Sequence, residues 1–131
     1  MFKYINPNPC KKLNDDCAIR AISIIQGIPW KQTYIDLCNR GLMICDMPNS
    51  AATITLYLKE KGFERNVVSS DCPACFTISD FCEEYPYGDY IVLTDGHAVA
   101  VIDGNYYDTF DSGDLTPVYY WERRKDNGNI V

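Results

Sequence analysis

Basic residues are scarce in this chain, and a long apolar run is missing from it. The 131 residues include 12 lysines and arginines against 18 aspartates and glutamates, which gives a formal net charge of −6. Nucleic-acid binding needs a basic face, and the one basic cluster, residues 123–125, lies between two acids. A membrane span needs roughly 20 consecutive apolar residues. The sequence therefore predicts neither a nucleic-acid partner nor a membrane partner.

An apolar signal segment is also missing at the N-terminus, where residues 1–9 include two prolines and no apolar core. This predicts a protein that stays in the reducing cytoplasm. Disulfides are rare in that compartment, and the seven cysteines are an odd number. We therefore expect free thiols and not a framework of bridges.

The length of the chain fits one ordinary domain, and no linker, repeat or low-complexity stretch divides it. A hydrophobic share of 47% with 23% charged residues is typical of a globular protein. We expect a single domain over residues 1–131, with no cofactor. The sequence does not define the oligomeric state.

Apolar periodicity changes half-way along the chain. In the first half, caps, prolines and glycines predict helices over 17–26, over 30–40 with Gly41 as its stop, from Asn49 or Ser50 to Lys61, and from Thr77. In the second half, alternating apolar residues between glycine turns predict strands over 89–94, 97–102, 105–110 and 117–122. This order indicates an α+β domain, with N-terminal helices packed on a C-terminal antiparallel β-meander.

Cys17 falls at the predicted start of the first helix, directly after Asp15 and Asp16. A cysteine reacts as the thiolate, and a helix N-terminus lowers the pKa of a thiol through the helix dipole and the N–H groups. The same N–H groups suit the oxyanion of a tetrahedral intermediate. The two aspartates oppose the thiolate unless they point away, or unless Arg20, one turn further on, offsets them. A buried thiol with a purely structural role is the alternative.

His97, the only histidine, opens a predicted strand after a glycine turn, so any imidazole base that serves a cysteine must be this one. A two-residue turn at Asp103-Gly104 pairs the strands so that Asp108 lies on the face of His97, diagonal to it. Asp108 is therefore the predicted carboxylate that orients the imidazole. A three-residue loop selects Asp111 instead, which stays in reserve. A strand histidine without a catalytic role is the alternative.

Two segments resemble the small papain-like cysteine peptidases, and most closely their bacterial and phage members. They are residues 14–23, Asn-Asp-Asp-Cys-Ala-Ile-Arg-Ala-Ile-Ser, and residues 95–113, which begin Asp-Gly-His. The order of cysteine, histidine and acid matches that superfamily, and the helix-then-strand layout is similar to its minimal core over most of the chain. The resemblance implies a thiol hydrolase that cleaves a peptide, isopeptide or related amide bond of a protein or peptide substrate, with Cys17, His97 and Asp108 as its triad.

The chain departs from that family in two respects. Papain-like enzymes carry a Gln or Asn before the cysteine to complete the oxyanion hole, but Lys11 stands six residues before it here. Asn14 is the candidate in its place, with a cap or turn role as the alternative. Ala18 follows the cysteine where many members have an aromatic residue. Such folds include non-catalytic members, so the alternative function is an idle, possibly phage-encoded domain that binds or inhibits a partner in the same cleft.

A second cysteine pattern joins Cys72 and Cys75, two residues apart, to Cys82. Structural zinc needs four ligands, and a second Cys-x-x-Cys pair is missing, so a zinc-stabilised interaction domain is the least favoured hypothesis. A redox pair lacks the strand-turn-helix setting that such motifs occupy. We predict thiols in a loop and no metal site.

Overall fold

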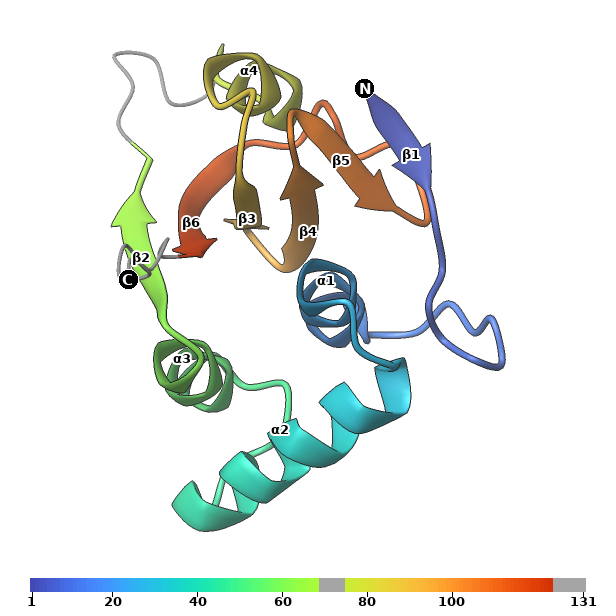
Figure 1. Cartoon of the computed structure of the whole chain (residues 1–131), viewed down its shortest axis with the longest axis vertical. Coiled ribbons are helices and arrows are strands. Elements are labelled where there is room, and N and C mark those ends of the chain that lie inside the picture. The colour runs from blue at the N-terminus through green and yellow to red at the C-terminus, as the bar shows by residue number, and fades with distance from the viewer. Residues whose placement is uncertain (69–74, 124–131) are drawn as a thin grey trace, which may run out of the picture.

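The computed structural model describes residues 1–68 and 75–123, which form four helices and six strands. In chain order these are β1 (Phe2–Tyr4), α1 (Cys17–Gln26), α2 (Trp30–Ile44), α3 (Ala51–Glu60), β2 (Phe63–Val67), α4 (Ile78–Glu84), β3 (Asp89–Thr94), β4 (His97–Ile102), β5 (Asn105–Asp108) and β6 (Pro117–Arg123). The strands make one mixed sheet, with α1, α2 and α3 on one side and α4 on the other (Figure 1). The architecture agrees with the predicted α+β class.

The strand order differs from the predicted meander. The sheet runs β1-β5-β4-β3-β6-β2, so only β3, β4 and β5 follow one another as antiparallel neighbours. β6 returns to pair with β3 on its far side, and β1 pairs with β5 in parallel. A continuous meander is therefore wrong, because alternation identifies strands but not their neighbours. β1 and β2 escaped prediction because the first has three residues and the second carries an exposed Glu64-Arg65 pair in place of alternating apolar residues.

Glycine has different roles in the first two helices. α1 has the predicted bounds and ends at Gly27, whose φ of 66° is a left-handed conformation that glycine adopts without strain. α2 continues past Gly41 to Ile44, and Cys45 takes the left-handed cap with φ of 57°. A Cβ at position 41 would lie 2.6 Å from the Asp46 carbonyl oxygen. The predicted helix stop at Gly41 is therefore wrong. Glycine is needed at position 41 because the backbone at Asp46 packs too closely against it to leave room for a side chain.

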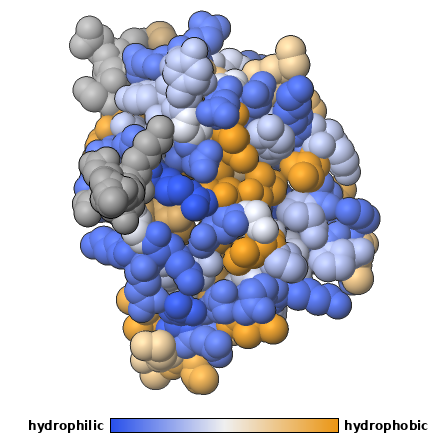
Figure 2. Space-filling model, in the orientation of Figure 1, coloured by the Kyte–Doolittle hydropathy of each residue, from blue (hydrophilic) through white to orange (hydrophobic). Residues whose placement is uncertain are grey.

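The sheet separates two apolar clusters. One joins α1, α2 and α3 to the sheet and includes the fully buried Ile22, Leu37 and Leu58. The other joins α4 to the opposite face, around Phe81 and Val99. In the face that Figure 2 presents, apolar side chains gather at the centre within a ring of hydrophilic ones. None of the helices in the described ranges is long and apolar enough to cross a membrane.

Candidate active site

Cys17 is the first residue of α1, at the point where the helix meets the sheet. Its side chain is half-buried, and it hydrogen-bonds to the imidazole of His97 and to the backbone of Ala98. As the first helical residue it lies at the positive end of the helix dipole. Asp16, directly before it, is turned into the protein, whereas Asp15 stays exposed at the surface.

His97 opens β4 after the turn that joins it to β3, and it pairs with Thr94 across that turn. Its Nε2 lies 2.7 Å from Oδ2 of Asp108, which leaves Nδ1 as the ring nitrogen that can serve the thiol. The imidazole side chain is 14% exposed and the Asp108 carboxylate 2% exposed. The ring therefore lies between a buried carboxylate and the thiol of Cys17.

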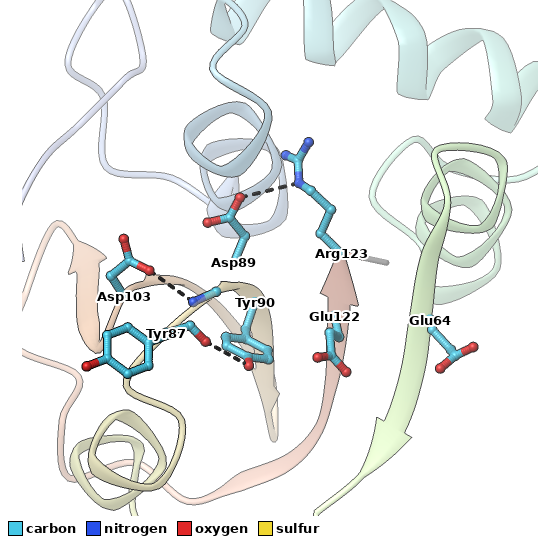
Figure 3. Close-up of a pocket in the computed structure, with 8 residues that line it drawn as sticks. Glu64, Tyr87, Asp89, Tyr90, Asp103, Glu122 and Arg123 are labelled. Carbon is cyan, nitrogen blue, oxygen red and sulfur yellow. Dashed lines mark hydrogen bonds and ion pairs between the residues drawn. The ribbon is translucent and has the colours of Figure 1, made fainter. Parts of the chain in front are cut away.

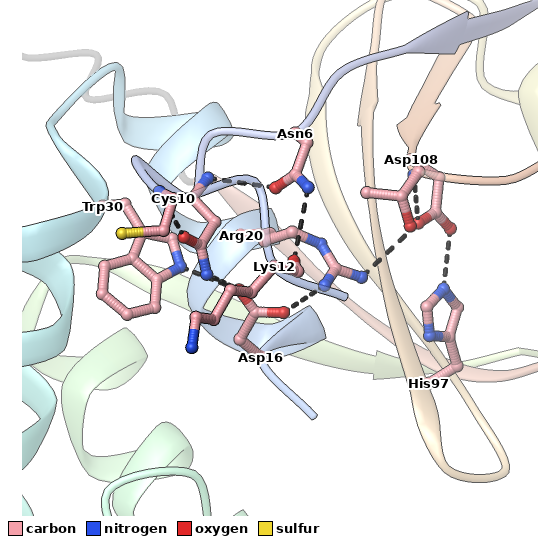
Figure 4. Close-up of polar contacts among 10 residues, drawn as sticks. Asn6, Cys10, Lys12, Asp16, Arg20, Trp30, His97 and Asp108 are labelled. Atoms are coloured by element: carbon pink, nitrogen blue, oxygen red, sulfur yellow. Dashed lines mark hydrogen bonds and ion pairs between the residues drawn. The ribbon is translucent and has the colours of Figure 1, made fainter. Parts of the chain in front are cut away.

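Asp108 is the last residue of β5 and is held by four groups. Two of them, His97 and Arg20, are labelled in Figure 4. Oδ2 accepts hydrogen bonds from His97 and from the Ser112 hydroxyl, at 2.7 and 2.8 Å. Oδ1 accepts from the backbone N–H of Thr109 at 2.8 Å and faces the guanidinium of Arg20 at 3.7 Å. The predicted strand therefore ends at residue 108 and not at 110, because the chain turns to bring Thr109 and Ser112 back to this carboxylate.

Asp111, the reserve candidate, lies elsewhere. It accepts hydrogen bonds from the Tyr106 hydroxyl and from the backbone N–H of Gly113, and both lower the pKa of its carboxyl group. The register that favoured Asp108 is present, with Ile102 opposite Asn105 and Ala100 opposite Tyr107. Asp108 lies one residue beyond this pairing, so the structure brings together the first-choice residue and not the reserve.

The electrostatic environment favours a charged pair. Burial raises the pKa of the Cys17 thiol, but the hydrogen bonds from His97 and Ala98, with the positive charges of His97 and Arg20, bring it below its ordinary value. For His97, burial lowers the pKa, whereas the hydrogen bonds and negative charges of Asp108 and Cys17 raise it to about 9. Opposite shifts in a thiol and its imidazole partner are what a thiolate–imidazolium pair requires at neutral pH.

Cys17 and His97 open onto a cleft of about 710 Å³. Its walls come from the loop before α1, the start of α3, the β3–β4 turn, and β6. Apolar and neutral side chains predominate among those that line it, including Ile54, Leu93, Thr94, Phe110 and Tyr119. The volume falls within the range of ordinary small-molecule and peptide pockets, which is roughly 300–1,000 Å³. The thiol is therefore accessible to a substrate.

Asn14, the oxyanion candidate, lines the same cleft and is exposed. Its backbone carbonyl accepts a hydrogen bond from the Asp16 N–H at 2.7 Å, which shapes the turn into α1. Its side chain thus lies at the rim of the cleft on the same loop as the nucleophile. Its contribution to an oxyanion hole stays a prediction.

Several site residues escaped prediction from the sequence. Ser112 lies four residues after the carboxylate that it contacts, and Asn8 and Trp30 reach Asp16 from separate segments. Only long-range packing brings these groups together, so no local pattern indicates them. Arg20 is different, because the sequence left open that it offsets Asp15 or Asp16, and in the structure it forms an ion pair with Asp16.

The remaining cysteines give no metal site within the described residues. Cys82 is buried in the cluster under α4, and burial raises the pKa of its thiol to about 11, so it is a poor metal ligand. Cys75 is disulfide-bonded, which corrects the expectation that all seven thiols are free. That expectation came from the inferred compartment, whereas a bridge depends on how close two cysteines lie in the fold. Cys72 lies outside the described residues.

A second hollow, of about 760 Å³, opens at another part of the surface (Figure 3). Acids predominate among the residues that line it, with Asp89 in an ion pair with Arg123 at 3.4 Å and Asp103 bonded to the Gly88 N–H. Its lining includes neither a thiol nor an imidazole. The cleft at Cys17 is therefore the candidate active site, because it combines a nucleophile with a base.

Comparison with protein-family models, curated proteins and solved structures finds no match for this chain. The likeness to papain-like peptidases therefore rests on the sequence segments around Cys17 and His97.

Proposed function

We propose that this protein is a thiol-dependent hydrolase that cleaves a peptide, isopeptide or related amide bond in a protein or peptide substrate. One observation carries the proposal. The single imidazole of the chain, His97, is held by a buried carboxylate 2.7 Å away and hydrogen-bonds to a thiol at a helix start, inside an open cleft. Cys17 is then the nucleophile, His97 the acid and base, and Asp108 the group that orients the ring.

In the first half of the reaction, the thiolate of Cys17 attacks the carbonyl carbon of the scissile bond and forms a C–S bond. The carbonyl electrons move to the oxygen, which becomes an oxyanion. As this intermediate collapses, the C–N bond breaks and the His97 imidazolium gives its proton to the departing nitrogen. The products are a thioester on Cys17, a free amine and a neutral imidazole.

In the second half, neutral His97 accepts a proton from water while the water oxygen attacks the thioester carbon. The second tetrahedral intermediate expels the Cys17 thiolate and releases a carboxylic acid. His97 is again an imidazolium, so the thiolate–imidazolium pair is restored. Asp108 keeps its hydrogen bond to Nε2 throughout, which holds Nδ1 toward the reacting atoms.

The oxyanion would be stabilised by N–H donors near the sulfur. The backbone N–H of Cys17 lies at the first turn of α1, where a helix has no acceptor for its N–H groups within itself. Asn14 would add a side-chain amide from the rim of the cleft. Loss of one such donor typically costs about 100- to 1,000-fold in turnover, so Asn14→Ala tests whether the amide has this role.

Turnover is the test of the proposal. The chain is incubated with fluorogenic peptide amides of varied sequence and with ubiquitin-like isopeptide conjugates, and amine release is followed. We expect hydrolysis that disappears in Cys17→Ala and falls by about 100- to 10,000-fold in His97→Ala. Cys45→Ala, which removes an exposed thiol at the end of α2, is the matched control and should keep full activity.

Two results would contradict the proposal. One is hydrolysis that persists in Cys17→Ala. The other is a peptide or protein that binds in the cleft, as measured by calorimetry, without being cleaved. The second result would favour the idle binding or inhibitory domain.

A further inference from the structure

A chain of alternating charges extends from the candidate site into the protein (Figure 4). The guanidinium of Arg20 forms an ion pair with Oδ1 of Asp16 and lies 3.7 Å from Oδ1 of Asp108. Asp108 in turn contacts His97, which contacts Cys17. Five charged groups therefore follow one another, with the signs negative, positive, negative, positive and negative.

The inner part of this chain is almost sealed from water. The side chains of Asp16, Arg20 and Asp108 are 5%, 8% and 2% exposed. A buried charge without a partner of opposite sign is strongly unfavourable, so the two buried carboxylates need a cation between them. Arg20 is that cation, and it is the residue that the proposed reaction leaves without a role.

The arginine is itself held in place from the far end. Asp16 accepts hydrogen bonds from the Asn8 amide and the Trp30 indole on Oδ2, at 3.2 and 3.0 Å, and it contacts Arg20 with Oδ1. Two segments outside α1 thus hold the Asp16 carboxylate, and the carboxylate in turn holds the Arg20 guanidinium. Arg20 has little freedom to turn away from Asp108.

We infer that Arg20, with Asp16 as its fixed counter-ion, is a positioning residue that orients the Asp108 carboxylate toward His97 and favours the Cys17 thiolate. The inference rests on the proposed function of the site, although it is tested through the thiol and not through turnover. Arg20 lines the inner part of the cleft, and its guanidinium makes charged contacts with Asp16 and Asp108. It acts through the carboxylate that it faces and through its charge.

The charged and titratable groups around the Cys17 sulfur come from five parts of the chain. The loop before α1 contributes Asp15 and Asp16, α1 contributes Arg20, β4 contributes His97, β5 contributes Asp108, and β6 contributes Tyr119. The α3 residues that line the cleft, Ala51 and Ile54, are uncharged. Loss of Arg20 therefore leaves three carboxylates near the thiol with only the imidazolium to balance them.

The experiment measures the pH midpoint of Cys17 alkylation by iodoacetamide, followed for each cysteine peptide by mass spectrometry. In Arg20→Met we expect the midpoint to rise by about one pH unit or more, so that at pH values below both midpoints the rate falls ~10-fold. Arg20→Lys keeps the charge and should retain most of the wild-type value. Arg40→Met is the matched control, because Arg40 pairs with Glu60 at the surface of α2 and should leave the midpoint unchanged.

Asp16→Asn gives a second, opposite test that does not depend on the stability of the methionine variant. It removes a negative charge and leaves Arg20 without its counter-ion, so the midpoint should fall. In the double variant Asp16→Asn with Arg20→Met, both charges are gone and the midpoint should return toward the wild-type value.

A folded Arg20→Met protein with the wild-type midpoint would overturn the inference, as would an Asp16→Asn midpoint that does not fall. Folding is checked by near-ultraviolet circular dichroism. Labelling of the wild-type protein distinguishes a failure of the proposed function from a failure of the inference about Arg20. If Cys17 titrates like the exposed Cys10 and Cys45, the proposed function itself fails. If Cys17 is activated but insensitive to Arg20 and Asp16, only this inference fails.

Discussion

At the scale of single residues, His97 is the centre of the site. One ring nitrogen contacts a buried carboxylate and the ring also contacts a thiol, so negative partners flank it. Each partner favours the protonated ring, which is why its pKa is about 9 and not the ordinary 6.5. Because the chain has one histidine, the titration of this group can be followed without assignment.

Removal of the Asp108 carboxylate should lower the pKa of His97. In Asp108→Asn the imidazolium loses the negative charge beside it, and the neutral amide is a weaker hydrogen-bond acceptor than the carboxylate. The ring should therefore titrate closer to 6.5 than to 9. The measurement is a pH titration of the imidazole C–H resonances by NMR. Asp111→Asn is the matched control, and it should titrate as wild type because Asp111 contacts Tyr106. An Asp108→Asn titration equal to that of wild type would show that this carboxylate does not hold the ring.

The sequence predicted these three residues for identifiable reasons. The helix-cap pattern indicated that Cys17 begins a helix, and His97 is the only histidine of the chain. The Asp103-Gly104 turn defined the strand register that places Asp108 on the face of His97. The left-handed φ values at that turn, 48° and 77°, are those that a two-residue hairpin needs. The sequence could not predict Ser112, Asn8 and Trp30, because their contacts depend on how distant segments pack.

At the scale of elements, α1 and α2 show that glycine can have two different roles in a helix. Glycine commonly stops a helix, and Gly27 does so at the end of α1. Gly41 instead lies within α2, where the chain after the helix folds back and the Asp46 N–H donates to the Gly41 carbonyl at 2.8 Å. Composition and spacing give no sign of this close approach, so the end of α2 was predicted four residues too early.

Gly41→Ala should therefore destabilise the protein, although alanine is the better helix former by about 1 kcal/mol. The new Cβ would meet the Asp46 carbonyl oxygen at 2.6 Å, and the backbone would have to move. We expect a net loss of about 1–3 kcal/mol in the free energy of unfolding, measured by urea denaturation. Asn39→Ala, at an exposed position of the same helix, should change stability by less than about 0.5 kcal/mol. A Gly41→Ala protein as stable as wild type would contradict this account of α2.

At the scale of the whole molecule, the sheet divides the protein into a face that carries the site and a face that does not. The cluster under α1 includes Ala18 and Ala98, the neighbours of Cys17 and His97. The cluster under α4 centres on Phe81, which stacks with Tyr85 and contacts Tyr90 and Tyr120 edge-on. Stability and reactivity should therefore respond to different substitutions.

Phe81→Leu should lower stability without changing the thiol. The smaller side chain leaves unfilled space in the α4 cluster, with an expected cost of about 1–3 kcal/mol in the free energy of unfolding. The alkylation rate of Cys17 in the folded protein should stay within about twofold of wild type, because additivity holds for sites without shared partners. Urea denaturation gives the first quantity and peptide mass spectrometry the second. A large change in the alkylation rate would mean that the two faces are coupled.

The whole fold could be predicted only in outline from the sequence. The change from helical to alternating periodicity indicated the α+β class. All four strands expected in the second half are present, two of them with the expected bounds, whereas β5 ends two residues earlier and β6 one residue later than predicted. The sheet order could not be predicted, because β1 and β6 find their partners over long separations along the chain. Pairing of β1 with β5 places Tyr4 beside Asp108, so even the predicted site depends on a strand that the sequence did not indicate.

The most direct test of the central claim is peptide-resolved labelling by iodoacetamide near pH 7, in the wild-type protein and in His97→Ala. The exposed Cys10 and Cys45 serve as internal references in both proteins. We predict that Cys17 reacts faster than either reference in wild type and at least ~10-fold more slowly once the imidazole is removed. Labelling of Cys17 at or below the reference rates, or a rate that His97→Ala leaves unchanged, would contradict the account.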